Sequence, residues 1–299
     1  MRYGGFTRQS AACLFAICAL GAGYAQAQVT LTHIHGLSWS ADGKQLMIPS
    51  HHGLAVFEGG RWSKAAGPQH DYMGFTATAK HYFSSGHPAA GSGMTNPFGI
   101  IRSRDGGKTW DKLGLEGETD FHLLAAGWAS GAVYAWNPQP NSRMRVPGLH
   151  VTLSDGFSWK HASAGGLEGE PRALAAHPAD PATVAVATSR GVYLSRDSGA
   201  RFAAIAVGAE GLAVFFDLDG KQLWYGTFDG RPRLARIPVA GGLPVQAALP
   251  PLDRDAVAYI AQNPAKRGEY AIATFGRNVY LSSDGARAWK QIAARGEGK

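Results

Sequence analysis

The sequence predicts an all-β protein, a six-bladed β-propeller. Glycine accounts for 40 of the 299 residues, and only 17% of residues are charged. Short apolar runs alternate with turn residues after residue 27, without the longer periodicity of amphipathic helices. Aromatic residues also recur at intervals typical of propeller blades, which are about 40–50 residues long. Trp62, Trp110, Trp159 and Phe202 are 48, 49 and 43 residues apart, and Trp289 follows after a further 87.

An eight-residue pattern, S-x-D-x-G-x-x-W, ends at several of these aromatic positions. It occurs as Ser103–Trp110, as Ser282–Trp289 with alanine in place of the pattern's glycine, and as Ser195–Phe202 with a terminal phenylalanine. A shortened copy spans Ser154–Trp159, Glu58–Trp62 holds the equivalent place in the first repeat, and a degenerate repeat is expected around Asp229–Arg231. In such a turn the aspartate accepts hydrogen bonds from the local backbone, and glycine permits a positive φ. The aromatic residue is free to pack between blades.

Each repeat is expected to hold four strands, A to D, in up-and-down order, because apolar runs and turn residues alternate within it. In the first blade these are Gly36–Ser40, Gln45–Pro49, Gly53–Phe57 and Arg61–Lys64; in the second they are Tyr72–Thr78, His81–Ser85, Phe98–Ser103 and Thr109–Leu113. Residues 86–97 form an insertion between strands B and C of the second blade. Blades 3 to 6 are expected to begin near Phe121, Arg172, Gly211 and Ala256.

This topology predicts which loops share a face. The D–A and B–C loops lie at one end of the propeller, and the A–B and C–D loops, with the aspartate turns, lie at the other. Seven of the eleven histidines fall in loops of the first kind, all in blades 1 to 3. The other four are set aside, because His81 and His177 fall at A–B turns and His150 and His161 fall on strands.

The clustered histidines predict a transition-metal site, since imidazole is the commonest protein metal ligand. The candidate residues are His33, His35, His51, His52, His70, Asp71, Met73, His87, Asp120 and His122. In an extended chain His33 and His35 point the same way. The carboxylates would act as ligands or would orient an imidazole. Neutral imidazoles suit copper or zinc, and Met73 or Met94 would favour copper. The alternative is that each loop histidine only satisfies backbone groups or faces solvent.

The N-terminus predicts an exported protein. Arg2 and Arg8 precede the apolar run Ala11–Ala22, and Ala25–Ala27 is an A-x-A cleavage pattern. Residues 1–27 are therefore expected to be a signal peptide, and residues 28–299 a single propeller domain, periplasmic or secreted. The apolar run of 12 residues is too short for a stable membrane anchor. Both cysteines, Cys13 and Cys18, lie in the signal, so any metal site must use other ligands.

Charge argues against nucleic-acid binding. Without the signal the chain has 27 Lys and Arg residues against 22 Asp and Glu residues. The basic residues are scattered, whereas nucleic-acid binding requires a concentrated basic face.

The remaining loops of the histidine face leave other functions open. They carry Glu168, Glu170, Arg172, Arg190, Asp229, Arg231, Asp253, Arg254, Asp255 and Arg277. These groups could bind a sugar acid or pair with one another, and pairing is the favoured interpretation. One alternative function is a carbohydrate hydrolase, which needs two facing carboxylates. Another is a platform for assembly with an envelope protein, marked by an exposed apolar patch.

The aspartate-turn pattern resembles the Asp-box, or BNR, repeat. In addition, several segments are similar to an exported bacterial family of BNR/Asp-box repeat β-propellers labelled as glycosylhydrolases: His33–Leu37, Ser50–Leu54, His70–Phe75, Ser84–Pro88, Asn96–Gly99 and Thr119–His122. The resemblance implies a propeller, and its hydrolase label is an analogy of fold. Sialidases share the Asp-box but open on Arg-Ile-Pro, which here occurs only as Arg236–Pro238 in blade 5. The sequence therefore departs from the sialidase pattern.

Overall fold

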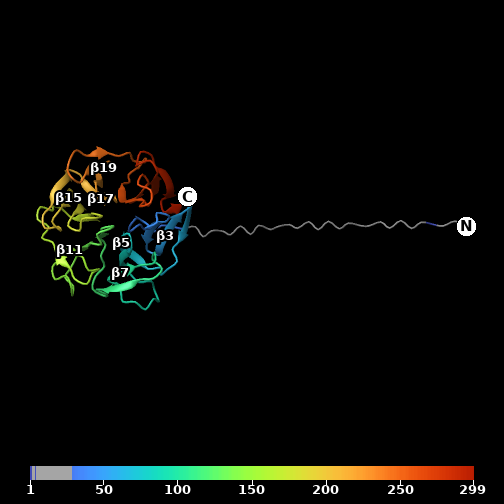
Figure 1. Cartoon of the computed structure of the whole chain (residues 1–299), viewed down its shortest axis with the longest axis horizontal. Helices are drawn as coiled ribbons and strands as arrows, with labels where there is room; N and C mark the ends of the chain where they lie inside the picture. Colours follow the sequence, from blue (N-terminus) through green and yellow to red (C-terminus); the bar gives the residue numbers. More distant parts are fainter. Residues whose placement is uncertain (2–3, 5–28) are drawn as a thin grey trace.

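The chain folds into a ring of six antiparallel sheets, as the repeats predict (Figure 1). The structure is a computed structural model and describes residues 1, 4 and 29–299. The predicted signal peptide lies outside the described residues. Each sheet is a blade whose strands are neighbours in the sequence, so only local pairing is needed within a blade. Within the described part of the chain, no helix is long and apolar enough to cross a membrane.

The first three blades carry the histidine-rich loops. Blade 1 contains β1 (Ser38–Trp39), β2 (Leu46–Ser50), β3 (Gly53–Glu58) and β4 (Arg61–Lys64). Blade 2 contains β5 (Asp71–Ala77), β6 (Tyr82–His87), β7 (Ile100–Ser103) and β8 (Asp111–Gly114). Blade 3 contains β9 (Leu124–Ala126), β10 (Val133–Asn137), β11 (Gly148–Thr152) and β12 (Lys160–His161).

The other three blades complete the ring. Blade 4 contains β13 (Pro171–Ala176), β14 (Val184–Thr188), β15 (Gly191–Ser195) and β16 (Ala203–Val207). Blade 5 contains β17 (Glu210–Phe216), β18 (Gln222–Phe228), β19 (Pro232–Pro238) and β20 (Val245–Gln246). Blade 6 contains β21 (Val257–Gln262), β22 (Tyr270–Thr274), β23 (Val279–Ser282), β24 (Lys290–Ala294) and β25 (Glu297–Gly298). The fifth strand of blade 6 was not predicted.

The Asp-box turns lie at C–D hairpins, as predicted. Asp105 connects β7 to β8, and Asp197 and Asp284 occupy the same place in blades 4 and 6. In blade 2 Asp105 Oδ1 accepts hydrogen bonds from Ser103 Oγ at 2.9 Å and from the backbone N–H of Thr109 at 2.9 Å. Thr109 therefore belongs to the turn, which explains why β8 begins two residues later than predicted.

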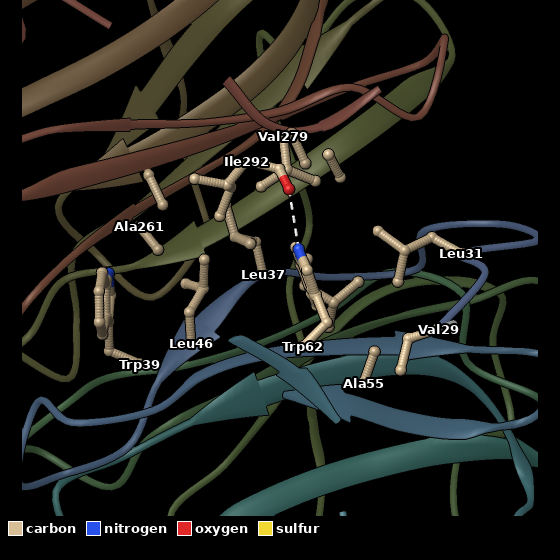
Figure 2. Close-up of a cluster of buried hydrophobic side chains, with 14 residues drawn as sticks. Val29, Leu31, Leu37, Trp39, Leu46, Ala55, Trp62, Ala261, Val279 and Ile292 are labelled. Atoms are coloured by element: carbon tan, nitrogen blue, oxygen red, sulfur yellow. Dashed lines mark hydrogen bonds between the residues drawn. The ribbon is translucent and has the colours of Figure 1, made fainter. Parts of the chain in front are cut away.

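The core consists of six apolar clusters, one between each pair of neighbouring blades. The cluster between blades 1 and 6 closes the ring (Figure 2). There the Trp62 indole N–H donates to the Ile292 carbonyl at 2.8 Å. The chain segment before blade 1 joins the same seam, because Leu31 N–H donates to the Gly296 carbonyl at 2.7 Å and Thr30 pairs with Glu297. Residues 29–31 thus complete blade 6 immediately before the chain reaches His33.

Candidate metal centre

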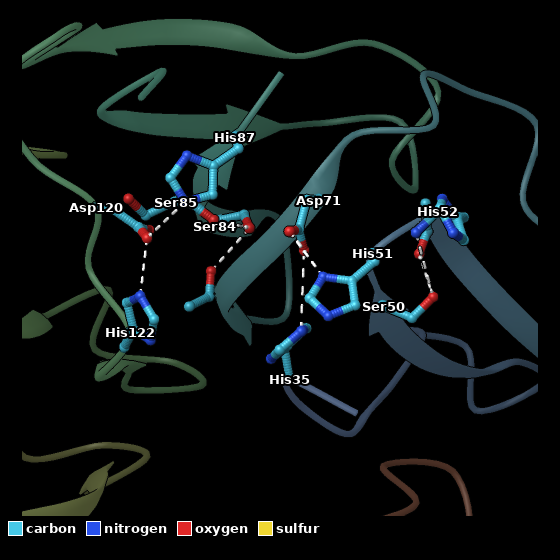
Figure 3. Close-up of polar contacts among 12 residues, drawn as sticks. His35, Ser50, His51, His52, Asp71, Ser84, Ser85, His87, Asp120 and His122 are labelled. Carbon is cyan, nitrogen blue, oxygen red and sulfur yellow. Dashed lines mark hydrogen bonds and ion pairs between the residues drawn. The ribbon is translucent and has the colours of Figure 1, made fainter. Parts of the chain in front are cut away.

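The histidine-rich loops meet at one end of the propeller, opposite the Asp-box hairpins. His33 and His35 precede β1, and His51 lies in the tight turn between β2 and β3. Asp71 is the first residue of β5, which enters the ring beside blade 1. Figure 3 shows His35 and His51 both directed at Asp71. Blades 1 and 2 therefore supply the side chains of one site.

Three imidazoles converge at this site. One ring nitrogen from each of His33, His35 and His51 lies within 4.8 Å of the corresponding nitrogens of the other two. The ring centroids of His33 and His51 are 4.5 Å apart, and those of His35 and His51 are 4.8 Å apart. Across residues 29–299 this triad is the only group of three potential metal ligands with such spacing. The sequence prediction that His33 and His35 point the same way is consistent with this convergence.

Local backbone pairing holds the triad in place. The backbone N–H of His35 donates to the Pro49 carbonyl at 3.1 Å, which ties the strand leading into β1 to the end of β2. The β2–β3 turn ends at Gly53, whose φ of 90° is a conformation that glycine adopts readily. The two segments that carry His35 and His51 are therefore fixed relative to each other by the same hairpin.

Asp71 sets the tautomer of His51. His51 Nδ1 is 2.7 Å from Asp71 Oδ2, and because a carboxylate can only accept, the imidazole must donate there. In the neutral ring this leaves Nε2 with a free lone pair. A carboxylate behind an imidazole is the usual arrangement around metal-binding histidines, where it fixes the orientation of the ring.

His35 is poised as a neutral ligand. Its side chain is only 14% exposed, and burial lowers the pKa of His35 to about 4, with His51 and His33 adding to the effect and Asp71 opposing it. The imidazole is therefore unprotonated near neutral pH. Its Nε2 is buried without a hydrogen-bond partner, as is Asp71 Oδ1, at a separation of 3.8 Å. Buried polar atoms usually have partners, so two unpaired ones beside the triad mark a place where a ligand would satisfy them.

A second histidine group surrounds Asp120. Asp120 Oδ2 contacts His122 Nε2 at 2.8 Å and His87 Nε2 at 3.1 Å (Figure 3). His87 Nδ1 also contacts Asn96 Oδ1 at 2.7 Å. The hydrogen bond to Asp120 raises the pKa of His122. This carboxylate already occupies a nitrogen of both rings. The structure thus divides the sequence-predicted residues into two groups around two aspartates.

Three further candidates lie apart from both groups. His70 is only 4% exposed and packs against Tyr72 and Phe98, and its Nδ1 accepts a hydrogen bond from the backbone N–H of Ala89 at 2.9 Å. It therefore supports the insertion after β6. His52 is exposed beside Ser50, and Met73 is partly buried on β5. The sequence predicted the loop or strand in which each of these residues lies, but it could not predict the direction in which the side chain points.

A large cavity opens beside the second histidine group. Its volume is about 1350 Å³, and blades 3 to 6 form its walls. Asp120 and His122 line it, together with Arg172, Asp253, Arg254 and Asp255 from the predicted set of rim residues. Sequence reasoning missed Trp136, Phe275 and Arg295, which also line it. Nothing in their local sequence distinguishes them from core aromatics or surface arginines.

Solved structures with similar folds include carbohydrate-active and sensor propellers. The GH74 enzyme of Niastella koreensis superposes with a TM-score of 0.61 at 15% identity, covering 90% of this chain and 47% of that enzyme. An ancestral GH74 enzyme gives a TM-score of 0.54 at 12% identity, with coverages of 89% and 39%. The extracellular domain of a protein described as a hybrid two-component system from B. thetaiotaomicron gives 0.55 at 12% identity, with coverages of 91% and 34%.

These similarities establish the fold. The chain spans about half or less of the length of these structures. No protein-family model matches the sequence, and neither does any curated protein. The molecule is thus a six-bladed β-propeller structurally similar to GH74 and related repeat propellers, and its function must be argued from its own site.

Proposed function

We propose that this protein binds a copper or zinc ion through His33, His35 and His51. The convergence of three imidazole nitrogens within 4.8 Å carries the proposal. Imidazole nitrogens bind such ions at about 2.0–2.1 Å, which requires ligand nitrogens roughly 3–4 Å apart. The triad therefore needs only a small contraction. His33 and His51 lie outside the strands, where such a movement disturbs little pairing.

The ligand set bears on the choice of metal. Without the predicted signal the chain has no cysteine. Met94 packs against the apolar cluster between blades 1 and 2, so its thioether contributes to core packing there. Three nitrogen ligands suit zinc or oxidised copper, whereas reduced copper prefers sulfur. Three protein ligands also leave a coordination position for water or a small molecule, as in reactive zinc sites.

The same proposal places the protein outside the cytoplasm, in the periplasm or secreted. The predicted signal peptide supports this location. It is consistent with a role in metal handling in the cell envelope or in metal-dependent chemistry. The mass of the exported chain tests the location independently of metal binding.

The metal proposal is tested by calorimetry on untagged protein at pH 7.5 with Zn²⁺ and with Cu²⁺. We expect one ion per chain, and we expect the double variant His33→Ala and His35→Ala to lose tight binding because two of three ligands are gone. Asp71→Asn should weaken binding about 10–100-fold, since it replaces the carboxylate that orients His51 with a neutral amide and leaves the three imidazoles in place.

His81→Ala is the matched control, because His81 lies at an A–B turn on the opposite face. It should bind the metal as the unmodified protein does. If neither ion binds, or if His81→Ala lowers the metal affinity as much as His35→Ala does, the metal proposal is wrong.

A further inference from the structure

The cavity at the propeller mouth has the form of a ligand site separate from the histidine triad. Its volume of about 1350 Å³ exceeds the roughly 300–1000 Å³ of ordinary small-molecule pockets. Towards the axis it leads to a much smaller space of about 160 Å³ between the innermost strands, where His122 and Arg172 line both spaces. A ligand of several rings would therefore be held at the mouth.

Most charged groups of the cavity wall are already paired. Arg172 contacts Glu210 at 3.4 Å, and Asp120 is held by two imidazoles. Asp255 Oδ1 accepts from the Gly276 N–H at 2.8 Å, and its Oδ2 accepts from the Asn278 amide at 3.0 Å. These contacts do not join the predicted rim charges to one another: Arg172 pairs with Glu210, which is outside that set, and Asp255 is held by a backbone amide and an asparagine side chain. A few charged groups of the cavity wall remain to be accounted for.

Among the described residues, the exceptions in the wall are Asp253 and two arginines. Within the described part of the chain, neither Arg254 nor Arg295 makes an ion pair or a hydrogen bond through its guanidinium, although both line the cavity. Both have a φ of 50°, a left-handed conformation that is uncommon for residues other than glycine. Arg277 of the same blade also has a positive φ, but its guanidinium donates to the Thr32 carbonyl at 3.2 Å. In Arg295 this conformation belongs to the two-residue turn that it forms with Gly296 between β24 and β25. What the two arginines share is a guanidinium on the cavity wall that a ligand could bind.

The rest of the wall combines aromatic faces with hydroxyl-binding groups. Trp136 and Phe228 are partly exposed, and Phe275 is 60% exposed. Asp253 is an exposed acid next to Arg254 in the sequence and could accept hydrogen bonds from a ligand. Flat apolar surfaces with a few polar groups that fix orientation are the usual composition of a small-molecule site.

We propose that this cavity binds an acidic sugar. The carboxylate would be held by Arg254 and Arg295, because guanidinium groups match the planar geometry of a carboxylate. Ring hydroxyls would donate to Asp253, and the apolar face of the sugar ring would pack on the aromatic side chains. Neutral sugars would lack the carboxylate contact and leave both guanidinium groups unsatisfied. The proposal does not depend on the metal site, since the triad does not line the mouth cavity, and His35 lines only the smaller space towards the axis.

The experiment measures sugar binding to the metal-free protein in the presence of EDTA. The probes are D-galacturonate, D-glucuronate and a trimer of galacturonate, with galactose as the neutral control, and binding is followed by calorimetry. We expect at least one acidic probe to bind about tenfold or more tightly than galactose, because a charge-assisted hydrogen bond is lost in the neutral sugar. Tighter binding of the trimer indicates an acidic polysaccharide as the source, and equal binding indicates a free sugar acid.

Arginine variants assign the site. Arg254→Gln and Arg295→Gln should each weaken binding of the acidic probe by about tenfold or more. Arg233→Gln is the control, because Arg233 is exposed on β19, pairs with Asp229 and does not line the cavity. Thermal unfolding checks that each variant is folded. The proposal is overturned if no acidic probe binds at 10 mM, if galactose binds equally well, or if the Arg233 control loses as much affinity as the cavity variants. None of these results bears on metal binding.

Discussion

Two aspartates, Asp71 and Asp120, give the histidines of one rim opposite properties. His35 lies beside Asp71 but is buried, and burial outweighs the carboxylate and lowers its pKa. His122 is exposed and hydrogen-bonds directly to Asp120, which raises its pKa. An imidazole must lose its proton to bind a metal. The residue-level electrostatics therefore favour a metal at the triad rather than at His122, whose contact with Asp120 strengthens its hold on a proton.

The lowered pKa of His35 predicts how metal-free protein responds to acid. Its pKa is about 4 in the folded state and 6.5 in its ordinary state, so the unfolded chain binds a proton first as the pH falls. Folding stability is therefore lost between pH 6.5 and 4, by up to about 3 kcal/mol from this residue. Urea unfolding in EDTA at several pH values measures the loss.

His35→Gln provides the comparison, because glutamine stays neutral throughout this range. As the pH falls, the free energy of unfolding should decrease more for the unmodified protein than for the His35→Gln variant. Parallel pH curves for the two proteins would contradict the interpretation of His35 as a buried neutral imidazole.

At the level of elements, the strands were predictable and the side-chain directions in the loops were not. Alternating apolar residues and aspartate turns are local signals, and they placed all six blades. They also placed His33, His35 and His51 on one face. The same signals could not show that His70 turns inward onto Phe98, since this depends on an aromatic partner 28 residues away. Likewise, the positive φ of Arg295 belongs to the two-residue turn between β24 and β25, and β25 was not predicted from the sequence.

The seam between blades 1 and 6 supplies a prediction of its own. Leu31 is fully buried there, and its backbone pairs with Gly296. Leu31→Ala should lower the free energy of unfolding by about 2–5 kcal/mol, because it leaves a cavity in the cluster that closes the ring. Chemical denaturation measures this. Val207→Ala, at an exposed position on β16, should change stability by less than about 0.5 kcal/mol. An equally small effect at Leu31 would mean that the seam contributes little.

At the scale of the whole molecule, the closing seam and the metal triad share one short segment. Residues 29–31 complete blade 6, and His33 follows two residues later. The position of the triad therefore depends on ring closure. A ligand that binds only the folded state stabilises it. Metal bound at the triad would thus act on the same segment that joins the two ends of the propeller.

This shared segment bears on where the signal peptide is removed. Cleavage after Ala27 would leave Gln28 as the first residue and would keep Val29 and Leu31, which are both buried in the seam. Cleavage a few residues later would remove them and release the segment that leads to His33. We therefore expect the exported chain to begin at Gln28. Intact-mass measurement of protein from the envelope fraction should show the loss of residues 1–27. Retention of Met1, or a chain that begins after Leu31, would contradict this. A chain of the second kind should also bind metal less tightly, because His33 would lose the paired segment that precedes it and only the hydrogen bond from His35 to Pro49 would hold this stretch.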